Sequence, residues 1–187
     1  MHWDHVVVSG LPRSGTSMMM RMLEAGGLSV AQDHKRQADE SNPKGYYELE
    51  AVKQLPEDPS VLASHRGQAV KIIFALAYHL PADKQHALLV MRRPAGEVLE
   101  SQRRMLLRRG LEVTPLAIEE LEGALEEFLG WARASSHLNV LEVHYHAVLS
   151  NPLGESDRIA SHLGHTLNLE AMVEAVDPHL HRVKETH

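Results

Sequence analysis

The chain has 187 residues and a net charge of −6, from 19 lysines and arginines against 25 aspartates and glutamates. This acidic balance disfavours a protein that binds nucleic acid through bulk charge, and 4% aromatic residues disfavour rows of base-stacking rings. The sequence has no cysteine, which excludes disulfides, cysteine-ligated zinc, iron–sulfur clusters and thiol catalysis. The length and the 43% hydrophobic content fit one domain over residues 1–187.

Targeting and membrane signals are weak in this sequence. No stretch approaches the roughly 18 to 20 continuous apolar residues of a membrane-spanning helix. The first residues run directly into Val6 without the basic start and apolar stretch of a signal peptide. We therefore expect a cytoplasmic protein with no membrane partner and no nucleic-acid partner. A homo-oligomer is compatible with the sequence.

Short β-branched runs alternate with helical stretches along the chain. The pattern predicts strands over 5–9, 69–74, 87–92 and 139–144, and helices over 16–24, 94–109, 115–136, 151–163 and 168–176. Pro94 is expected as the first residue of its helix and Thr114 as the N-cap of the next. The polar segment 33–59 is expected to be loop with at most short helices. Such alternation predicts an α/β fold, a parallel sheet flanked by helices in a three-layer sandwich.

The most informative stretch follows the first predicted strand and reads Gly10-Leu11-Pro12-Arg13-Ser14-Gly15-Thr16-Ser17. A glycine-bearing turn that opens a helix gathers backbone N–H groups around one point, where phosphate or sulfate is stabilised. The spacing from Gly10 to Gly15 equals that of the nucleoside-triphosphatase loop, but Thr16 occupies the position of its lysine. No apolar run ends in an aspartate suited to Mg²⁺, which disfavours kinase chemistry. The simpler alternative is a tight turn with Arg13 in solvent.

The same loop carries a family resemblance. Residues 12–17 resemble the 5′-phosphosulfate loop, P-[KR]-S-G-T-[TS], of the sulfotransferases that use 3′-phosphoadenosine-5′-phosphosulfate (PAPS). The resemblance implies a P-loop nucleotide-binding domain in which Arg13 contacts the bridging and sulfuryl oxygens of the donor. It also implies that the 5′-phosphate is surrounded by Ser14, Gly15, Thr16 and Ser17. The family needs no metal, which agrees with the missing magnesium pattern.

A second motif, Arg92-Arg93-Pro94, follows the strand predicted over 87–92. The family's 3′-phosphate site pairs an arginine at a strand end with a serine eight residues later, a spacing matched by Arg93 and Ser101 rather than by Arg92. A guanidinium holds phosphate through two parallel N–H groups. A solvated basic helix face is the alternative, and we prefer it for Arg103, Arg104, Arg108 and Arg109.

The general base is less clear. Cytosolic sulfotransferases place a histidine two residues after a strand lysine, and if Lys71 is that lysine, Ile73 stands in the histidine position. The glutamate of the tyrosylprotein sulfotransferases corresponds in position to His34, beside Asp33. Glu48 ends a segment, 42–48, that resembles bacterial members of the family. The catalytic candidates are therefore Glu48, His34 and Asp33, with Lys71 next to the sulfuryl oxygens.

Several features depart from the family pattern. Met18 occupies the position of the adenine-stacking tryptophan, and Arg182 and Lys184 represent the C-terminal basic cluster of the 3′-phosphate site only loosely. The chain is short, so the acceptor site is expected to be open, shared with a partner subunit or lost. His144 and His146 alternate near a predicted strand end and could ligate zinc with a carboxylate, but dispersed histidines are the better interpretation.

The leading hypothesis is a PAPS-dependent sulfotransferase that transfers a sulfuryl group to a hydroxyl or amine of a small acceptor, with no metal. The alternatives are a non-catalytic nucleotide-binding P-loop module and an ATP-dependent small-molecule kinase.

Overall fold

The computed structural model describes residues 3–33, 35, 45–108, 110–111 and 117–177. The strands of this part are β1 (His5–Gly10), β2 (Ala69–Lys71), β3 (His86–Arg92) and β4 (Leu138–His144). Its α-helices are α1 (Thr16–Ala25), α2 (Phe74–Ala77), α3 (Ala95–Arg108), α4 (Ile118–Ala134), α5 (Tyr145–Ser150), α6 (Pro152–Leu163) and α7 (Leu169–Ala175). Two 3₁₀ helices, Glu50–Gln54 and Pro59–His65, lie between β1 and β2.

The four strands form one parallel sheet in the order β2-β1-β3-β4. Val7 of β1 lies opposite Val70 of β2 on one side and Leu88 of β3 on the other, and all three are fully buried. Strands buried on both faces read as continuous apolar runs, which explains the valine run in β1. Because β1 is flanked by β2 and β3, the carboxyl ends of these three strands open at one edge of the sheet.

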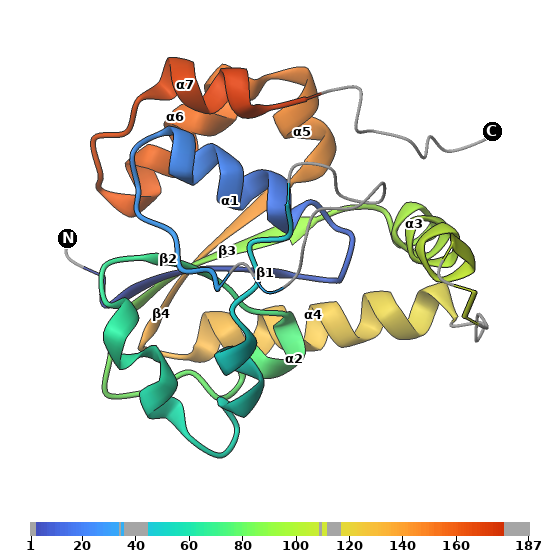
Figure 1. Cartoon of the computed structure of the whole chain (residues 1–187), viewed down its shortest axis with the longest axis horizontal. Helices are drawn as coiled ribbons and strands as arrows, with labels where there is room; N and C mark the ends of the chain where they lie inside the picture. Colours follow the sequence, from blue (N-terminus) through green and yellow to red (C-terminus); the bar gives the residue numbers. More distant parts are fainter. Residues whose placement is uncertain (1–2, 34, 36–44, 109, 112–116, 178–187) are drawn as a thin grey trace.

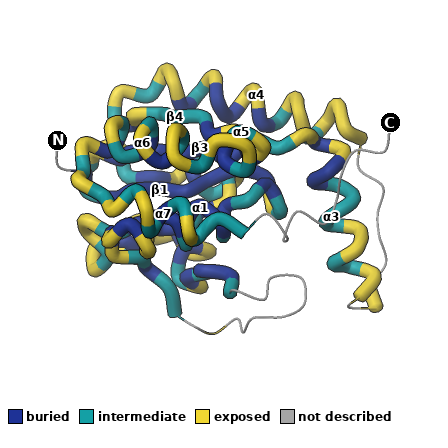
Figure 2. The backbone as a smooth tube through the Cα atoms, turned by 90° about the horizontal axis from the view of Figure 1, so that it is seen from above, coloured by how far each residue is buried: buried dark blue, intermediate teal, exposed yellow. Residues whose placement is uncertain are grey.

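Helices cover both faces of the sheet, as Figure 1 shows, so the predicted three-layer α/β architecture is confirmed. One face packs Val6 and Val8 against α1, α5, α6 and α7. The opposite face packs Val7 and Leu88 against α4, including its fully buried Phe128. Figure 2 shows the central strands buried between these layers, while the outer side of α4 is exposed. Among the described helices, none has the length and apolar character that crossing a membrane requires.

Several element boundaries differ from the prediction. The strand predicted over 69–74 ends at Lys71. The backbone N–H of Ile72 still donates to the carbonyl of Val8, and the chain then turns into α2 at Phe74. Helix α3 begins one residue after Pro94. Helix α4 begins at Ile118 with Ala117 as its N-cap. The N-cap predicted at Thr114 lies outside the described residues.

Helix α5 is an element that the sequence did not reveal. It starts at Tyr145, directly after the last residue of β4, without the glycine or proline that usually marks such a boundary. His146 therefore lies on a helix rather than on the strand that ends at His144. The pattern of alternating histidines on one strand face, which suggested zinc, does not apply.

Candidate functional site

The loop between β1 and α1 has an unusual backbone. Gly10, Arg13 and Gly15 have φ values of 140°, 78° and 106°, in the region that favours glycine. A Cβ on Gly15 would stand 2.7 Å from Cδ2 of Tyr145, and a Cβ on Gly10 would stand 2.7 Å from the carbonyl oxygen of Met91. These two glycines let the loop pass close to β3 and α5. Arg13 adopts the same region without being glycine, a strain that is typical of functional loops.

Ser14 lies at the centre of this loop and is 1% exposed. Its backbone N–H donates to the carbonyl of Leu11 over 3.1 Å, whereas its Oγ is buried and has no hydrogen-bond partner among the described residues. A buried hydroxyl without a partner is unfavourable by about 1–3 kcal/mol. Helix α1 begins two residues later, and its N-terminus attracts negative charge. The loop is therefore built to receive an oxygen-rich anion.

The turn between β3 and α3 lies against the same loop. Arg93 donates from a terminal guanidinium nitrogen to the carbonyl of Arg13 over 3.3 Å, and Arg13 donates from Nε to Ser101 Oγ over 3.1 Å. Gln102 adds a bond from Nε2 to the carbonyl of Pro12 over 2.9 Å. The structure thus brings together Arg13, Arg93 and Ser101, the three residues expected from the two sequence motifs.

Arg92 and Arg93 point in different directions, although they are neighbours. Arg92 is the last residue of β3 and pairs with Glu126 of α4 at 2.6 Å and with Glu142 of β4 at 3.2 Å. Arg133 of α4 pairs with Glu142 as well. Successive residues of a strand face opposite sides of the sheet, which explains the divergence. Only Arg93 contacts the β1–α1 loop.

Arg93 is held by groups that sequence analysis missed. Its Nε donates to Oε2 of Glu97 over 2.8 Å, and its guanidinium lies 4.5 Å from the ring centre of Tyr145. Glu97 is 2% exposed, and its Oε1 is 3.0 Å from Nε2 of His146. The i, i+4 spacing of Arg93 and Glu97 was a usable signal, because such pairs share a helix face. Tyr145 and His146 gave no signal, since their role depends on the unpredicted α5.

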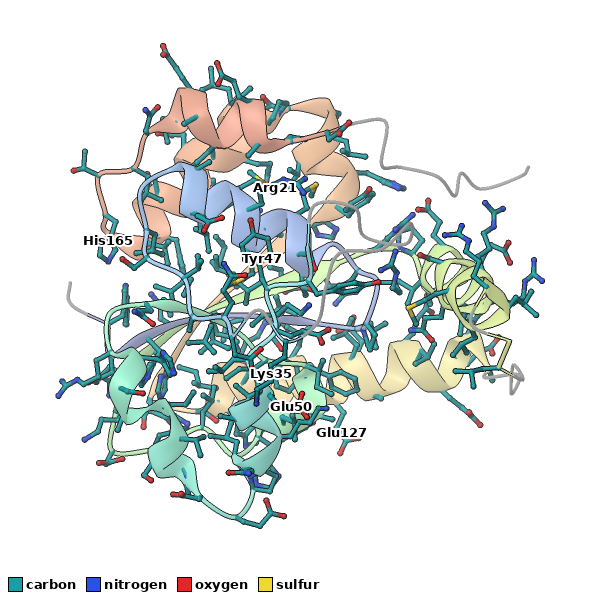
Figure 3. The ribbon with its side chains drawn as sticks, viewed as in Figure 1. Arg21, Lys35, Tyr47, Glu50, Glu127 and His165 are labelled. Atoms are coloured by element: carbon teal, nitrogen blue, oxygen red, sulfur yellow. The ribbon has the colours of Figure 1, made fainter. Side chains whose placement is uncertain are left out.

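Positive charge gathers around the Tyr145 hydroxyl. Burial raises the pKa of Tyr145, while the guanidinium groups of Arg93, Arg13 and Arg21 act in the opposite direction. Arg21, which Figure 3 labels on α1, donates from Nε to the carbonyl of Ala175 at the end of α7 over 2.8 Å. Burial lowers the pKa of Arg21. Three cations therefore lie near one region of the carboxyl edge: Arg21 from α1, Arg13 from the β1–α1 loop and Arg93 from the turn between β3 and α3.

On the other side of the loop, β2 contributes Lys71. Its side chain is 11% exposed, and Nζ donates to the carbonyl of Tyr46 over 2.6 Å and to Ser17 Oγ over 3.4 Å. Oε1 of Glu48 lies 3.6 Å from the same Nζ. Glu48 and Lys71, two of the catalytic candidates, are therefore neighbours beside the first turn of α1.

The backbone around Glu48 is fixed to α1. Tyr47 has a φ of 53°, and its hydroxyl donates to Oε2 of Glu24 over 2.7 Å. Burial, together with this hydrogen bond, raises the pKa of Tyr47. Figure 3 shows the Tyr47 side chain next to α1, below Arg21. These contacts position the Glu48 side chain at the carboxyl edge of β2.

Asp33 makes different contacts from Glu48. Its carboxylate accepts from the backbone N–H of Glu50 over 2.7 Å and of Lys35 over 3.0 Å, and these bonds hold its pKa below the usual value. It therefore connects residue 35 to the start of the 3₁₀ helix Glu50–Gln54. The remaining predicted site residues, His34 and Arg182, lie outside the described residues.

Three further expectations can be placed in the fold. Met18, in the position of the expected stacking ring, is buried in the core beneath α1. Arg103 and Arg104 of the basic α3 face each pair with Glu100, at 2.7 and 2.6 Å. Within the described ranges, no three histidine, aspartate or glutamate side chains are arranged to hold a metal ion.

No protein-family model and no curated protein sequence matches this chain. Solved structures do match it. The sulfotransferase domain of the olefin synthase from Synechococcus PCC 7002 aligns with a TM-score of 0.57 and 14% identity over 97% of this chain and 80% of that chain. Sulfotransferase STF1 from Mycobacterium tuberculosis aligns with a TM-score of 0.56 and 18% identity, over 94% of this chain and 71% of that one.

A mouse sulfotransferase complexed with PAP aligns with a TM-score of 0.52 and 16% identity, over 92% of this chain and 62% of its own. At this level of identity the likeness concerns the fold. The chain has a sulfotransferase-like α/β fold, as the two sequence motifs predicted.

Proposed function

We propose that the chain is a sulfotransferase that transfers a sulfuryl group from PAPS to a hydroxyl or amine of a small acceptor. The observation that carries the proposal is the single contact network formed by Arg13, Ser101 and Arg93 across the β1–α1 and β3–α3 corners. Two motifs identified independently in the sequence meet there, at the edge of a sulfotransferase-like sheet.

The donor fits the chemistry of these groups. PAPS carries a phosphosulfate at its 5′ end and a phosphate at its 3′ end, and both are anions. The buried Ser14 Oγ and the N-terminus of α1 offer donors to the 5′ end, with Arg13 beside them. Arg93 and Ser101 offer donors to the 3′-phosphate. Because Ser14 and the N-terminus of α1 are positioned before any ligand arrives, they would stabilise charge on the leaving 5′-phosphate without reorganisation.

We assign the acceptor side to the β2 edge. In the transfer, the acceptor oxygen or nitrogen forms a bond to sulfur while the bond from sulfur to the 5′-phosphate oxygen breaks. The acceptor proton passes to the carboxylate of Glu48, the candidate base beside Lys71. Lys71 is placed to stabilise the sulfuryl oxygens, because its Nζ is already 3.4 Å from Ser17 Oγ in the first turn of α1.

Transfer of radiolabelled sulfate from PAPS to a panel of phenols, alcohols and amines tests this function. Adenosine 3′,5′-bisphosphate (PAP), the nucleotide product, should also stabilise the protein by about 2.7 kcal/mol at about 100 times its Kd, whereas ATP with Mg²⁺ should have little effect.

Two results would favour the alternatives. Stabilisation by PAP without transfer to any acceptor would point to a binding module. Preferential stabilisation by ATP with Mg²⁺ would point to a kinase, against the threonine at position 16.

A further inference from the structure

A buried carboxylate lies beside Arg93, in the part of the site proposed to bind the 3′-phosphate. Glu97 is 2% exposed and accepts from Arg93 Nε over 2.8 Å, so it offsets the charge of the guanidinium that faces the proposed 3′-phosphate. A negative group at an anion site weakens binding unless it serves another purpose. Its second oxygen, Oε1, lies 3.0 Å from Nε2 of His146.

The side chains of His146, Glu97 and Arg93 contact one another in series, from the solvent to the β1–α1 loop. His146 is 47% exposed, Glu97 is buried, and Arg93 is 7% exposed and contacts the carbonyl of Arg13 in the β1–α1 loop. The Tyr145 ring, 4.5 Å from the guanidinium, fixes the other side of Arg93. Such a carboxylate orients a guanidinium fork.

We propose that Glu97 and His146 are positioning residues that hold the Arg93 guanidinium in the orientation that receives a phosphate. The inference rests on the proposed function, since the phosphate in question is the 3′-phosphate of the donor nucleotide.

These three side chains and their neighbours come from several elements. Glu97 comes from α3, Arg93 from the β3–α3 turn and His146 from α5. The Tyr145 hydroxyl beside them also lies in the field of Arg13 and Arg21. Asp177 in turn acts on Arg21 from beyond α7.

The binding test compares wild type with His146→Ala and with His146→Gln, whose side-chain amide can still reach Glu97. We expect PAP to bind His146→Ala about tenfold more weakly than wild type and His146→Gln within about twofold of wild type. His165→Ala is the matched control, because Figure 3 places His165 at the opposite end of the molecule from α3. Equal affinity of wild type and His146→Ala overturns the proposal.

A second measurement needs no ligand and separates this inference from the proposed function. The Arg93 Nε–H is predicted to exchange with solvent about tenfold faster in His146→Ala than in wild type, and at the wild-type rate in His146→Gln. NMR of the free protein measures these rates. Equal exchange in all three proteins overturns the positioning role. If wild type does not bind PAP, the proposed function fails while the exchange experiment still decides whether His146 positions Arg93.

Discussion

Arg13 and Ser101 are 88 residues apart in the sequence, yet Nε of Arg13 donates to Ser101 Oγ over 3.1 Å. Each residue was expected at a different end of the same nucleotide. Their contact shows that the β1–α1 loop and helix α3 are already assembled around one region. The proposed nucleotide site therefore lies between two segments that already touch.

Ser101→Ala is predicted to weaken PAP binding by about tenfold, because a hydrogen bond to a charged phosphate is lost. Isothermal titration calorimetry measures the change. Binding of adenosine 5′-phosphate, which lacks the 3′-phosphate, should remain within about twofold of wild type. An equal loss for both nucleotides would place Ser101 at the wrong end of the ligand.

Arg93→Lys is predicted to weaken PAP binding by at least about tenfold. The lysine keeps the positive charge near the buried Glu97 but loses the planar fork that holds phosphate. Arg92→Lys is the matched control, since Arg92 pairs with α4 and β4 and should leave the affinity within about twofold. If Arg92→Lys gave the larger loss, the alignment of this motif would have to move by one residue.

Glu48→Gln is predicted to lower kcat for sulfate transfer by about a hundredfold or more, because the proton of the acceptor loses its base. PAP affinity should not change, since Glu48 lies on the β2 side of the loop beside Lys71. Steady-state assays with the best acceptor of the panel, combined with calorimetry, separate these two effects.

Asp33→Asn serves as the comparison for Glu48→Gln. Asp33 accepts two backbone N–H groups, so this variant should lose stability but keep kcat within about twofold. His34→Gln completes the set. An intact rate in Glu48→Gln together with a large loss in His34→Gln would transfer the role of base to His34.

The unfolding free energy is predicted to fall in acid because of two buried histidines at the amino ends of β1 and β3. Nδ1 of His5 and Nδ1 of His86 are 3.3 Å apart, and each Nε2 faces a backbone carbonyl. Burial lowers the pKa of His86 to about 4 and also lowers that of His5. The unfolded chain, with a histidine pKa of about 6.5, takes up protons first as the pH falls.

Stability from these groups is therefore complete above about pH 6.5 and is lost as the pH falls toward about 4. His86 alone should remove about 2 kcal/mol between about pH 7 and about pH 4.5, measured by urea unfolding. His86→Asn should reduce this dependence even if it is less stable at neutral pH, and His165→Asn should not. An unchanged slope in His86→Asn would mean that other groups govern the acid response.

The sequence was sufficient for the layers of the fold and for the two anion-binding corners. The valine run of β1, the glycines on both sides of Arg13 and the eight-residue spacing from Arg93 to Ser101 are local patterns with direct structural meaning. The order of the strands brings the corners together, and the parallel alternation of strands and helices was enough to anticipate a common edge.

Other features depend on contacts between distant segments and had no local signature. Helix α5 starts without a turn residue, so the position of Tyr145 under Arg93 and the link from Glu97 to His146 were invisible. The early end of β2 was also missed, because its apolar pattern continues through Ile72 and Ile73 while the strand ends at Lys71. In both cases tertiary packing overrides the local pattern.

Strand β1 lies between β2 and β3, and these two neighbours contribute to different parts of the proposed site. Groups proposed to hold the nucleotide come from the β1–α1 loop and from the β3–α3 turn and helix α3, and groups proposed to act on the acceptor come from the β2 side. If the chain is the proposed sulfotransferase, changes in segment 45–49 and at the end of β2 should alter the choice of acceptor and leave the nucleotide site intact. Chimeras exchanged at β1 should combine the two halves in the same way.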